Sequence, residues 1–517
     1  MAFLFKERIT SFGQKPQTTT HPFAAEEEYA ALIKRESGVP LKVKQELDRR
    51  FQTQSGKGVG SCGTLINTIK CSVGAGILSF PYGFYVAGWL GALTAFLVIT
   101  LPVLYCLHTI GTVRRMLLED EIRLQKMTGL RADPSITEEE IKRLALESRD
   151  YLEFPDLAEL SVGKKLRAVV TVLVLMGQLG CCAAYVIFIG NNMSYIGASF
   201  GATASLPRVA YVSAVFPLIL LLSFVKTLRG LLPIAALGTL LLIAGLAVVG
   251  VHGVRAAEAS NHAIAMPPML GDGVILFIGM VLFSMESVTQ MPVLQASMEK
   301  PAKFPRILNV SIFGLLILYL VVGLGGAALF GADVDSIITR NLGLGVLGQV
   351  ARGLFCAMLL STFPFQMFPA ATIVERFFKP LDAADYDDED NNQRSMCTRL
   401  MTNFFVVRTV LCMFVILIAM SFEDFGQFLS LIGYPAMGTL GLVIPPIMCL
   451  SLDMRSKEGR LSSFDRTLCW IILCVGAVGC LCGTIWTLAD VAKGKVLPET
   501  AKDAEKAAES ATKFFFF

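Results

Sequence analysis

Residues 67–82 read NTIKCSVGAGILSFPY, an apolar stretch with features that a regular membrane-spanning helix avoids. Gly74, Ala75 and Gly76 form a small, flexible centre, and Pro81 lacks a backbone donor. In lipid, the backbone groups that a broken helix frees must be satisfied by protein, water or a ligand, so such breaks occur where they line a cavity. The stretch has two interpretations: a binding site, or a packing face that lets a neighbouring helix approach closely.

The composition of the 517-residue chain is that of a polytopic membrane protein. Hydrophobic residues make up 54% of it and charged residues 17%, and the mean hydropathy is +0.60. These values are too apolar for a soluble enzyme. Residues 1–55 are polar and mixed in charge, so we expect no short cleavable signal before the first apolar run.

Eleven apolar runs are long enough to cross a hydrocarbon core that needs about 20 helical residues. They lie at 62–86, 89–111, 167–190, 209–225, 231–251, 273–297, 307–330, 353–374, 404–421, 427–450 and 467–489. An odd number of spans places the two termini on opposite sides of the membrane, and the distribution of Lys and Arg then decides the orientation.

Basic residues are concentrated in alternate segments, which we place in the cytosol, whereas the outer loops carry only Arg208, Arg255, Arg340 and Arg352. The expected organisation is a cytosolic N-terminal tail (1–57), a transmembrane domain (58–489) with a long cytosolic loop at 112–165, and a non-cytosolic C-terminal tail (490–517). A capping box predicts a charged helix in that loop, from Glu138 to about Arg149.

Three smaller features follow from this topology. None of the 13 cysteines lies in a predicted outer loop, so no outer-loop disulfide is expected. Asn192-Met-Ser194 forms a glycosylation sequon at the outer end of the third span, close to the membrane. Arg408, about one turn inside the cytosolic end of its span, is expected to extend its guanidinium to the membrane surface.

The sixth span repeats the anomaly of the first. Gly273–Phe283 is an apolar half too short to cross the bilayer, and the polar run Ser284–Gln290 and then Pro292 follow it. Spans one and six open two halves of five spans each, and a repeat with an odd number of spans must be inverted in the membrane. Paired interruptions at corresponding positions predict a transport site at the repeat interface.

Backbone groups at these breaks suit a zwitterionic amino acid. The second half of the first span begins near Gly76, so the amides of Gly74, Ala75 and Gly76 present a partial positive charge to a carboxylate at mid-membrane. Carbonyls near Val73 and Phe283, at the ends of the facing half-helices, can accept hydrogen bonds from an ammonium group. Ser284 lies at the second break.

Side chains that could couple transport to an ion are fewer. Glu286 is the one acid deep in a span, and burial favours its protonated form, which makes it a candidate proton carrier. It could instead cap its helix or pair with Lys70. Asn67, Ser361 and Thr362 offer neutral oxygens for sodium, or hydrogen bonds between helices.

Three further side chains are candidates for the transport path. Gln178 and Tyr185 of the third span either face the substrate or pack, and Tyr434 could line an outer access route. The four histidines form no HExxH zinc motif, and no filter-like sequence is visible. We therefore expect neither an enzyme nor a channel, no metal and no cofactor, with a proton or sodium as coupling ion.

The pattern Asn67-x-x-Lys70-x-x-x-GAGILSFPYGF, followed by Ala87-Gly-Trp89, resembles the first-helix signature of the amino acid/auxin permease family, especially its proton-coupled and vacuolar branches. The motifs FSME (283–286), STFPFQ (361–366) and FLSLIG (428–433) are similar to that family's sixth, eighth and tenth helices. The resemblance implies an all-α protein of about eleven transmembrane helices, with a LeuT-like 5+5 inverted repeat and broken helices 1 and 6, that moves amino acids.

The expected function is secondary active transport by alternating access, as proton-coupled symport of amino acids towards the cytosol. Sodium coupling is one alternative, and an amino-acid-binding sensor without net transport is another. Glu28–Ile33 fits acidic dileucine and tyrosine-based patterns, which predict sorting adaptors and a lysosomal, vacuolar or endosomal membrane, with the plasma membrane as the alternative. The other expected partners are the amino acid and the lipid bilayer, and no nucleic acid is expected.

Overall fold

The computed structural model describes residues 60–132, 153–199, 207–224, 228–259, 267–296, 298, 303–378, 404–456 and 459–492. Their contacts belong to two units. The larger comprises Lys57–Asp120 and Lys142–Phe517, and the smaller comprises Met1–Gly56 and Glu121–Ile141, of which only residues 121–132 are described. The predicted sorting patterns at Glu28–Ile33 and the predicted helix from Glu138 lie outside the described residues.

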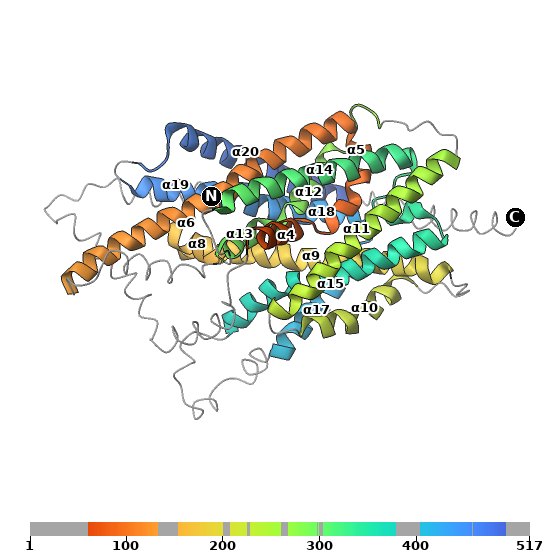
Figure 1. The fold of residues 1–517 in the computed structure, drawn as a ribbon, viewed down its shortest axis with the longest axis horizontal. Coiled ribbons are helices and arrows are strands. Elements are labelled where there is room, and N and C mark those ends of the chain that lie inside the picture. The colour runs from red at the N-terminus through yellow and green to blue at the C-terminus, as the bar shows by residue number, and fades with distance from the viewer. Residues whose placement is uncertain are drawn as a thin grey trace, which may run out of the picture. The chain divides into compact units, whose positions relative to one another are not determined.

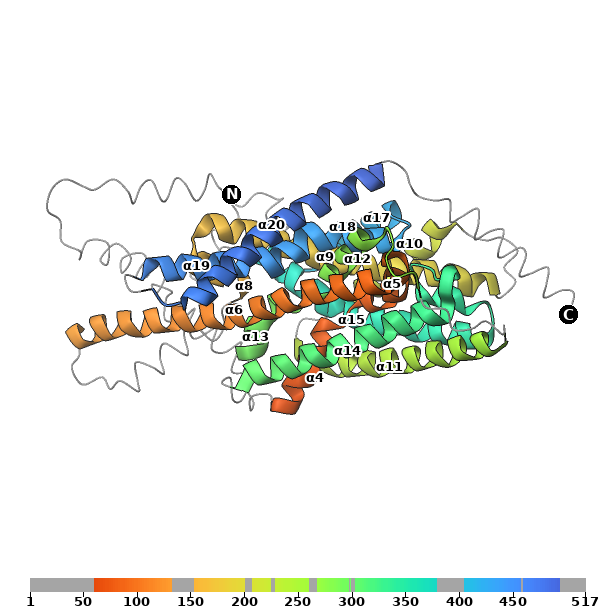
Figure 2. The ribbon, with the colours of Figure 1, turned by 90° about the horizontal axis from the view of Figure 1, so that it is seen from above.

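Each predicted span coincides with a helix or an interrupted helix (Figures 1 and 2). The continuous helices are α6 (Trp89–Ala132), α9 (Lys164–Ser199), α10 (Arg208–Ser223), α11 (Leu228–Ala259), α14 (Phe304–Phe330), α15 (Val346–Phe378), α17 (Phe404–Ser421) and α20 (Ser463–Ala492). The interrupted ones are α4 (Ser61–Ser72), η1 (Ala75–Ser79) and α5 (Phe80–Ala87); α12 (Val274–Ser284), η2 (Glu286–Gln290) and α13 (Met291–Ala296); and α18 (Phe425–Ile432), η8 (Gly433–Val443) and α19 (Ile444–Arg455). The short helix α8 (Phe154–Ser161) precedes α9.

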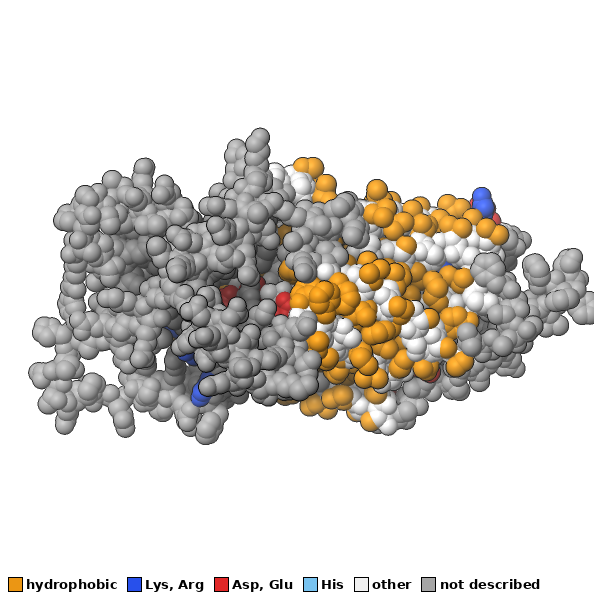
Figure 3. Space-filling model, turned by 90° about the horizontal axis from the view of Figure 1, so that it is seen from below, with side chains coloured by type: hydrophobic (Ala, Val, Ile, Leu, Met, Phe, Trp, Pro, Cys, Tyr) orange, Lys and Arg blue, Asp and Glu red, His pale blue; other side chains and the backbone are white. Residues whose placement is uncertain are grey.

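The described helices have the length and composition of membrane spans. Eight segments are long and apolar enough to cross a bilayer, and three shorter apolar helices are Ala75–Ala87, Arg208–Ser223 and Val274–Gln290. Figure 3 shows hydrophobic side chains gathered over the described part of the face in view, as expected of a surface that contacts lipid. The all-α polytopic fold is confirmed, and the count of eleven spans stays a prediction.

The first and sixth helices, both interrupted, lie side by side in opposite directions. α5, the second half of the first, packs on α12, the first half of the sixth. α4 in turn contacts η2 and α13. The first half of each helix therefore packs against the second half of the other, which is the antiparallel relation that an inverted repeat requires.

Helix α6 is longer than predicted. Its span was expected to end at 111, but the helix continues to Ala132 into the predicted cytosolic loop. Residues 112–132 are polar yet rich in Arg and Leu, which favour helix, and they contain no Pro. Loss of hydropathy marks the end of a span and not the end of its helix.

Arg408 does not extend to the membrane surface, so that prediction is wrong. Its side chain is buried, with Nε 3.2 Å from the Glu375 carboxylate of α15, and Nη1 donates to the carbonyl of Ser223 at the end of α10. The guanidinium also lies 4.2 Å from the centre of the Phe404 ring. A carboxylate and a helix C-terminus together satisfy the charge inside the bundle, so Arg408 ties α10, α15 and α17 together.

The sequon asparagine is part of a buried polar network. Asn192 Nδ2 donates to the Phe188 carbonyl at 2.9 Å, and Asn192 Oδ1 accepts from the hydroxyl of Thr339 in η5 (Ile338–Leu342). The Thr339 carbonyl accepts from Arg352 at 3.0 Å, and all three side chains are fully buried. Asn192 is inaccessible because α9 extends two turns beyond its predicted end at 190.

This burial predicts that Asn192 carries no glycan. Glycosidase treatment should leave the electrophoretic mobility of the protein unchanged, and Ser194→Ala, which destroys the sequon, should migrate like the wild type. Asn192→Ala leaves the buried Thr339 hydroxyl unpaired and should cost about 1–3 kcal/mol, seen as a lower thermal midpoint in detergent. A mobility difference between the wild type and Ser194→Ala would contradict the burial.

Candidate substrate site

The first helix breaks where the sequence predicts. α4 ends at Ser72, and Val73 (φ −101°, ψ 94°) and Gly74 (φ −102°, ψ −162°) are extended before η1 begins at Ala75. Every residue from Val73 to Ser79 is buried. The first amides of a helix have no intrahelical acceptor. Gly74, Ala75 and Gly76 therefore present backbone donors inside the protein.

Tyr319 of α14 supports this break from one side. Its hydroxyl donates to the Ser72 carbonyl, the last of α4, at 3.3 Å, and both residues are buried. The Tyr319 ring lies 4.4 Å from the Phe80 ring and 6.1 Å from the Phe96 ring. It thus contacts the end of the first half-helix and the start of the second. Sequence reasoning missed Tyr319, because nothing in the apolar run around it marks it.

The sixth helix breaks at the predicted polar run. α12 ends at Ser284, Met285 leaves the α-helical conformation (φ −95°, ψ 30°), and η2 starts at Glu286. Phe283 and Ser284 are buried, and the Ser284 hydroxyl donates to the Met280 carbonyl at 2.9 Å. That bond satisfies the Ser284 hydroxyl within its own helix.

The two breaks touch each other at Gly76 and Ser284. A Cβ built on Gly76 would lie 2.1 Å from Ser284 Oγ and 3.2 Å from Ser284 Cβ. The space that glycine leaves here is filled by α12, so close helix packing accounts for this glycine. The Gly76 amide belongs to the first turn of η1 and stays a candidate donor to a substrate carboxylate.

Side chains of α9 and α15 contact η2, the segment that follows the sixth-helix break. Gln366 of α15 donates through Nε2 to the Tyr185 hydroxyl of α9 at 3.5 Å, and Gln366 Oε1 accepts from Gln290 at 3.4 Å. Gln178 of α9 donates to the Thr289 hydroxyl at 3.5 Å, and the buried Gln178 Oε1 has no partner among the described atoms. The structure thus brings the predicted Tyr185 and Gln178 to the sixth-helix break, together with Gln290 and Gln366.

Gln290 and Gln366 were not predicted as site residues, although both lie in motifs that the sequence singles out. Gln290 ends the polar run after α12, and Gln366 ends the STFPFQ motif of α15. Polar side chains in apolar spans are the available sequence signal. Their pairing across two helices could be seen only in the fold.

The ion-coupling candidates are less well assembled. The side chains of Glu286 and Lys70 lie outside the described part of the structure. Ser361 and Thr362 donate to the Met358 carbonyl of their own helix, at 2.6 and 2.9 Å. Ser361 Oγ also fills the space at Gly238 of α11, so it lies at a helix packing contact.

Asn67 is not brought to these hydroxyls by any described contact. It lies on α4, half-buried, and the described residues include no hydrogen bond between Asn67 and Ser361 or Thr362. Asn67, Ser361 and Thr362 stay sodium-ligand predictions.

On the predicted outer side, the two half-helices are joined backbone to backbone. Amides of Trp89 and Leu90 donate to the carbonyls of Pro268 and Met269, at 3.0 and 3.1 Å. Gly271 and Gly273 donate in return to the carbonyls of Ala87 and Val86, at 3.0 and 2.9 Å. Gly88, at the centre of this junction, has a positive φ of 74°. The end of α5 and the start of α12 therefore form one connected element.

Aromatic side chains fill the space below that junction. Phe80 and Phe84 of α5 make edge contacts with Phe277 of α12, with ring centres 5.4 and 5.3 Å apart. Tyr434 of η8 is also buried, and its hydroxyl donates to the Ile275 carbonyl of α12 at 2.6 Å. The predicted access route at Tyr434 is occupied by packed side chains in this conformation.

Residues 59–489 match the family described as transmembrane amino acid transporter protein. The chain belongs to this family. Its members are transporters and not enzymes, and the resemblance seen in the first-helix signature is confirmed.

Curated relatives carry the same activity in their names. Amino acid transporter AVT3B of Arabidopsis thaliana is 27% identical, over 83% of this chain and 93% of the relative. Amino acid transporter ANT1 of Arabidopsis thaliana is 26% identical, over 85% and 95%. Vacuolar amino acid transporter 3 of Saccharomyces cerevisiae is 25% identical, over 64% and 47%.

Among solved structures, the chain is similar to the crystal structure of MhsT in complex with L-phenylalanine. The identity is 13% and the TM-score 0.44, over 83% of this chain and 99% of that chain. This likeness is too weak to add to the family assignment.

The contact between Gly76 and Ser284 can be tested by moving the glycine from position 76 to position 284. Gly76→Ala should lower both stability and uptake, because its Cβ meets Ser284. Adding Ser284→Gly removes the hydroxyl and Cβ of residue 284, so that only its Cα, at 3.5 Å, stays in contact with the new Cβ. The double variant should therefore have a higher thermal midpoint than Gly76→Ala, close to that of the wild type.

Uptake by the double variant separates the two roles of Gly76. Recovery of uptake together with stability would assign Gly76 to packing. A stable double variant without uptake would instead show that substrate approaches the Gly76 backbone. Ser284→Gly alone is the matched control.

The Tyr319 hydroxyl should matter at the break more than an equivalent hydroxyl elsewhere. Tyr319→Phe keeps the ring contacts but removes the donor to Ser72, at a cost of about 1 kcal/mol. We expect reduced uptake at normal abundance. Tyr105→Phe loses a bond to Asp465 far from the break and is the control. Unchanged uptake in Tyr319→Phe would show that the Ser72 carbonyl needs no such support.

Proposed function

We propose that the protein is a secondary active transporter that carries amino acids by alternating access. The observation that supports this most directly is the contact between two buried helix breaks, at Gly76 and Ser284, in half-helices that run antiparallel. Helix ends at such a site offer amides to a carboxylate and carbonyls to an ammonium group. The family membership and the names of the relatives support the amino acid as substrate.

For the coupling ion we propose the proton, carried by Glu286. Its backbone begins η2 directly after the break. On the same short element, Thr289 and Gln290 bond to side chains of α9 and α15. A change of charge at position 286 would therefore occur where several helices meet. Sodium coupling is the alternative, and it would require Asn67 to approach Ser361 and Thr362.

For the location we propose a vacuolar or lysosomal membrane with the N-terminus in the cytosol. The name of the yeast relative and the sorting patterns at Glu28–Ile33 support this. In an acidified compartment the proton gradient is directed towards the cytosol, so symport would move amino acids the same way.

Counterflow in proteoliposomes tests transport itself. Vesicles preloaded with unlabelled amino acids should accumulate labelled amino acid without an ion gradient, because a carrier exchanges the two. A sensor would bind the labelled amino acid without accumulating it. A panel of neutral and cationic amino acids in the same assay would define the substrate.

Glu286→Gln tests the proton role. Gln keeps the size of the side chain but cannot titrate, so we expect gradient-driven accumulation to be lost and part of the exchange to remain. Glu258→Gln, an exposed acid of α11, is the control and should behave like the wild type. Full sodium dependence, with the same pH profile in Glu286→Gln as in the wild type, would reject the proposal.

A further inference from the structure

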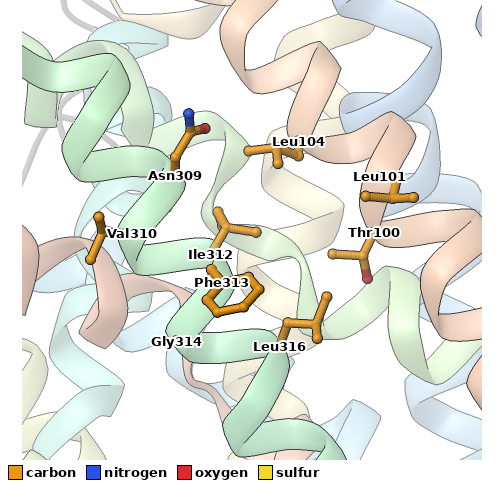
Figure 4. Close-up of a pocket in the computed structure, with 9 residues that line it drawn as sticks. All are labelled: Thr100, Leu101, Leu104, Asn309, Val310, Ile312, Phe313, Gly314 and Leu316. Carbon is orange, nitrogen blue, oxygen red and sulfur yellow. The ribbon is translucent and has the colours of Figure 1, made fainter.

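A groove with a volume of about 570 Å³ lies between α6 and α14 (Figure 4). Its walls are largely apolar and include Thr100, Leu101, Leu104, Ile312, Phe313 and Leu316. Leu101 is 57% exposed and Phe313 66% exposed. Both helices contain membrane-spanning segments, so the exposed Leu101 and Phe313 place the groove on the surface that we expect to face lipid.

Contacts between the two helices close the groove at both ends. The Phe96 and Tyr319 rings lie 6.1 Å apart at one end, and His108 Nε2 lies 2.6 Å from Asn309 Oδ1 at the other. From Phe96 to His108 an α-helix rises about 18 Å. One leaflet of a hydrocarbon core about 30 Å thick is about 15 Å deep. The groove therefore spans roughly one leaflet, with its polar end at the membrane surface.

Positive charge lies beyond that polar end. Arg115 is two turns past His108 on α6, and Arg306 is one turn before Asn309 on α14, so both continue the helix faces that line the groove. Both side chains are exposed, as is that of Lys303, three residues before Arg306. Glu119 is the exposed acid nearest to Arg115 along α6. Neither arginine forms an ion pair with another described residue.

We propose that this groove is a binding site for an anionic phospholipid, with one acyl chain between α6 and α14 and the headgroup at Arg115 and Arg306. The apolar walls and their length fit a single chain of one leaflet. In the predicted orientation this is the cytosolic leaflet, which carries the anionic lipids. The bound chain would lie beside Tyr319, which contacts the first-helix break.

Photolabelling in vesicles tests the acyl-chain site. The probe is phosphatidylserine with a diazirine on its acyl chain, in phosphatidylcholine vesicles that contain the full-length protein. Labelled peptides should come from 100–104 and 309–316 in preference to the lipid-facing stretch 475–481 of α20. Gly314→Leu should abolish that preference, because a side chain at Gly314 enters open space in the groove wall.

Gly325→Leu is the matched control. Gly325 lies on the same helix, also has no atom within 4 Å of a built Cβ, and lies outside the groove. Its labelling should equal that of the wild type. Labelling that is uniform over α6, α14 and α20, or unchanged in Gly314→Leu, would overturn the site. Cross-links from groove residues to a second copy of the chain would overturn the choice of occupant.

The headgroup part has its own measurement. A phosphatidylcholine that carries the same diazirine on its acyl chain should label the groove less than the phosphatidylserine probe does. Arg115→Gln and Arg306→Gln should each lower the preference for phosphatidylserine over phosphatidylcholine about fivefold, as expected for one basic side chain near a charged surface. Arg255→Gln, an exposed arginine at the end of α11, should leave the preference unchanged. Equal labelling by the two lipids in the wild type would overturn the role of the arginines.

Discussion

Every backbone polar group inside the bilayer needs a partner, and the arrangement of this transporter follows from that constraint. A broken helix frees amides and carbonyls at a depth where water is scarce. Here the last carbonyl of α4 is met by the Tyr319 hydroxyl, and Ser284 at the facing break bonds to its own helix. The amides of Gly74, Ala75 and Gly76 remain directed to the interior, which is the property that a carboxylate site needs.

Small residues allow the helices around the breaks to pack without gaps. A Cβ on Gly433 would lie 2.0 Å from the Gly279 carbonyl oxygen, and a Cβ on Gly279 would lie 2.1 Å from Ser430 Oγ. A Cβ on Gly83 would lie 2.3 Å from the Phe277 ring. α12 is therefore held between α5 on one side and α18 with η8 on the other. Such packing supplies the dispersion energy that holds helices together where lipid removes the hydrophobic drive.

The sequence predicted the fold well, because hydropathy and helix breakers are local properties. The positions of the spans and the interruptions of the first and sixth spans follow from runs such as GAGILSFP, whereas the π-helical segment Gly433–Val443 was not predicted. Helix ends were less predictable, since α6 and α9 continue where hydropathy falls. Both interpretations of Gly76 survive, because the packing contact with Ser284 leaves its amide in the first turn of η1. The partners of Arg408 and Gln366 come from helices far apart in sequence, so no local pattern could reveal them.

The backbone junction between residues 86–91 and 268–273 has a mechanical consequence. Main-chain hydrogen bonds cannot be loosened by a change of side-chain rotamer. Gly88 allows the two backbone segments to approach more closely than a residue with a side chain would permit. If α5 tilts, α12 must therefore tilt with it, because the two helices are joined at this junction. The freedom to bend lies at the other ends of these half-helices, at Gly74 and Met285. Any rearrangement of the pair would change the geometry of both breaks at once.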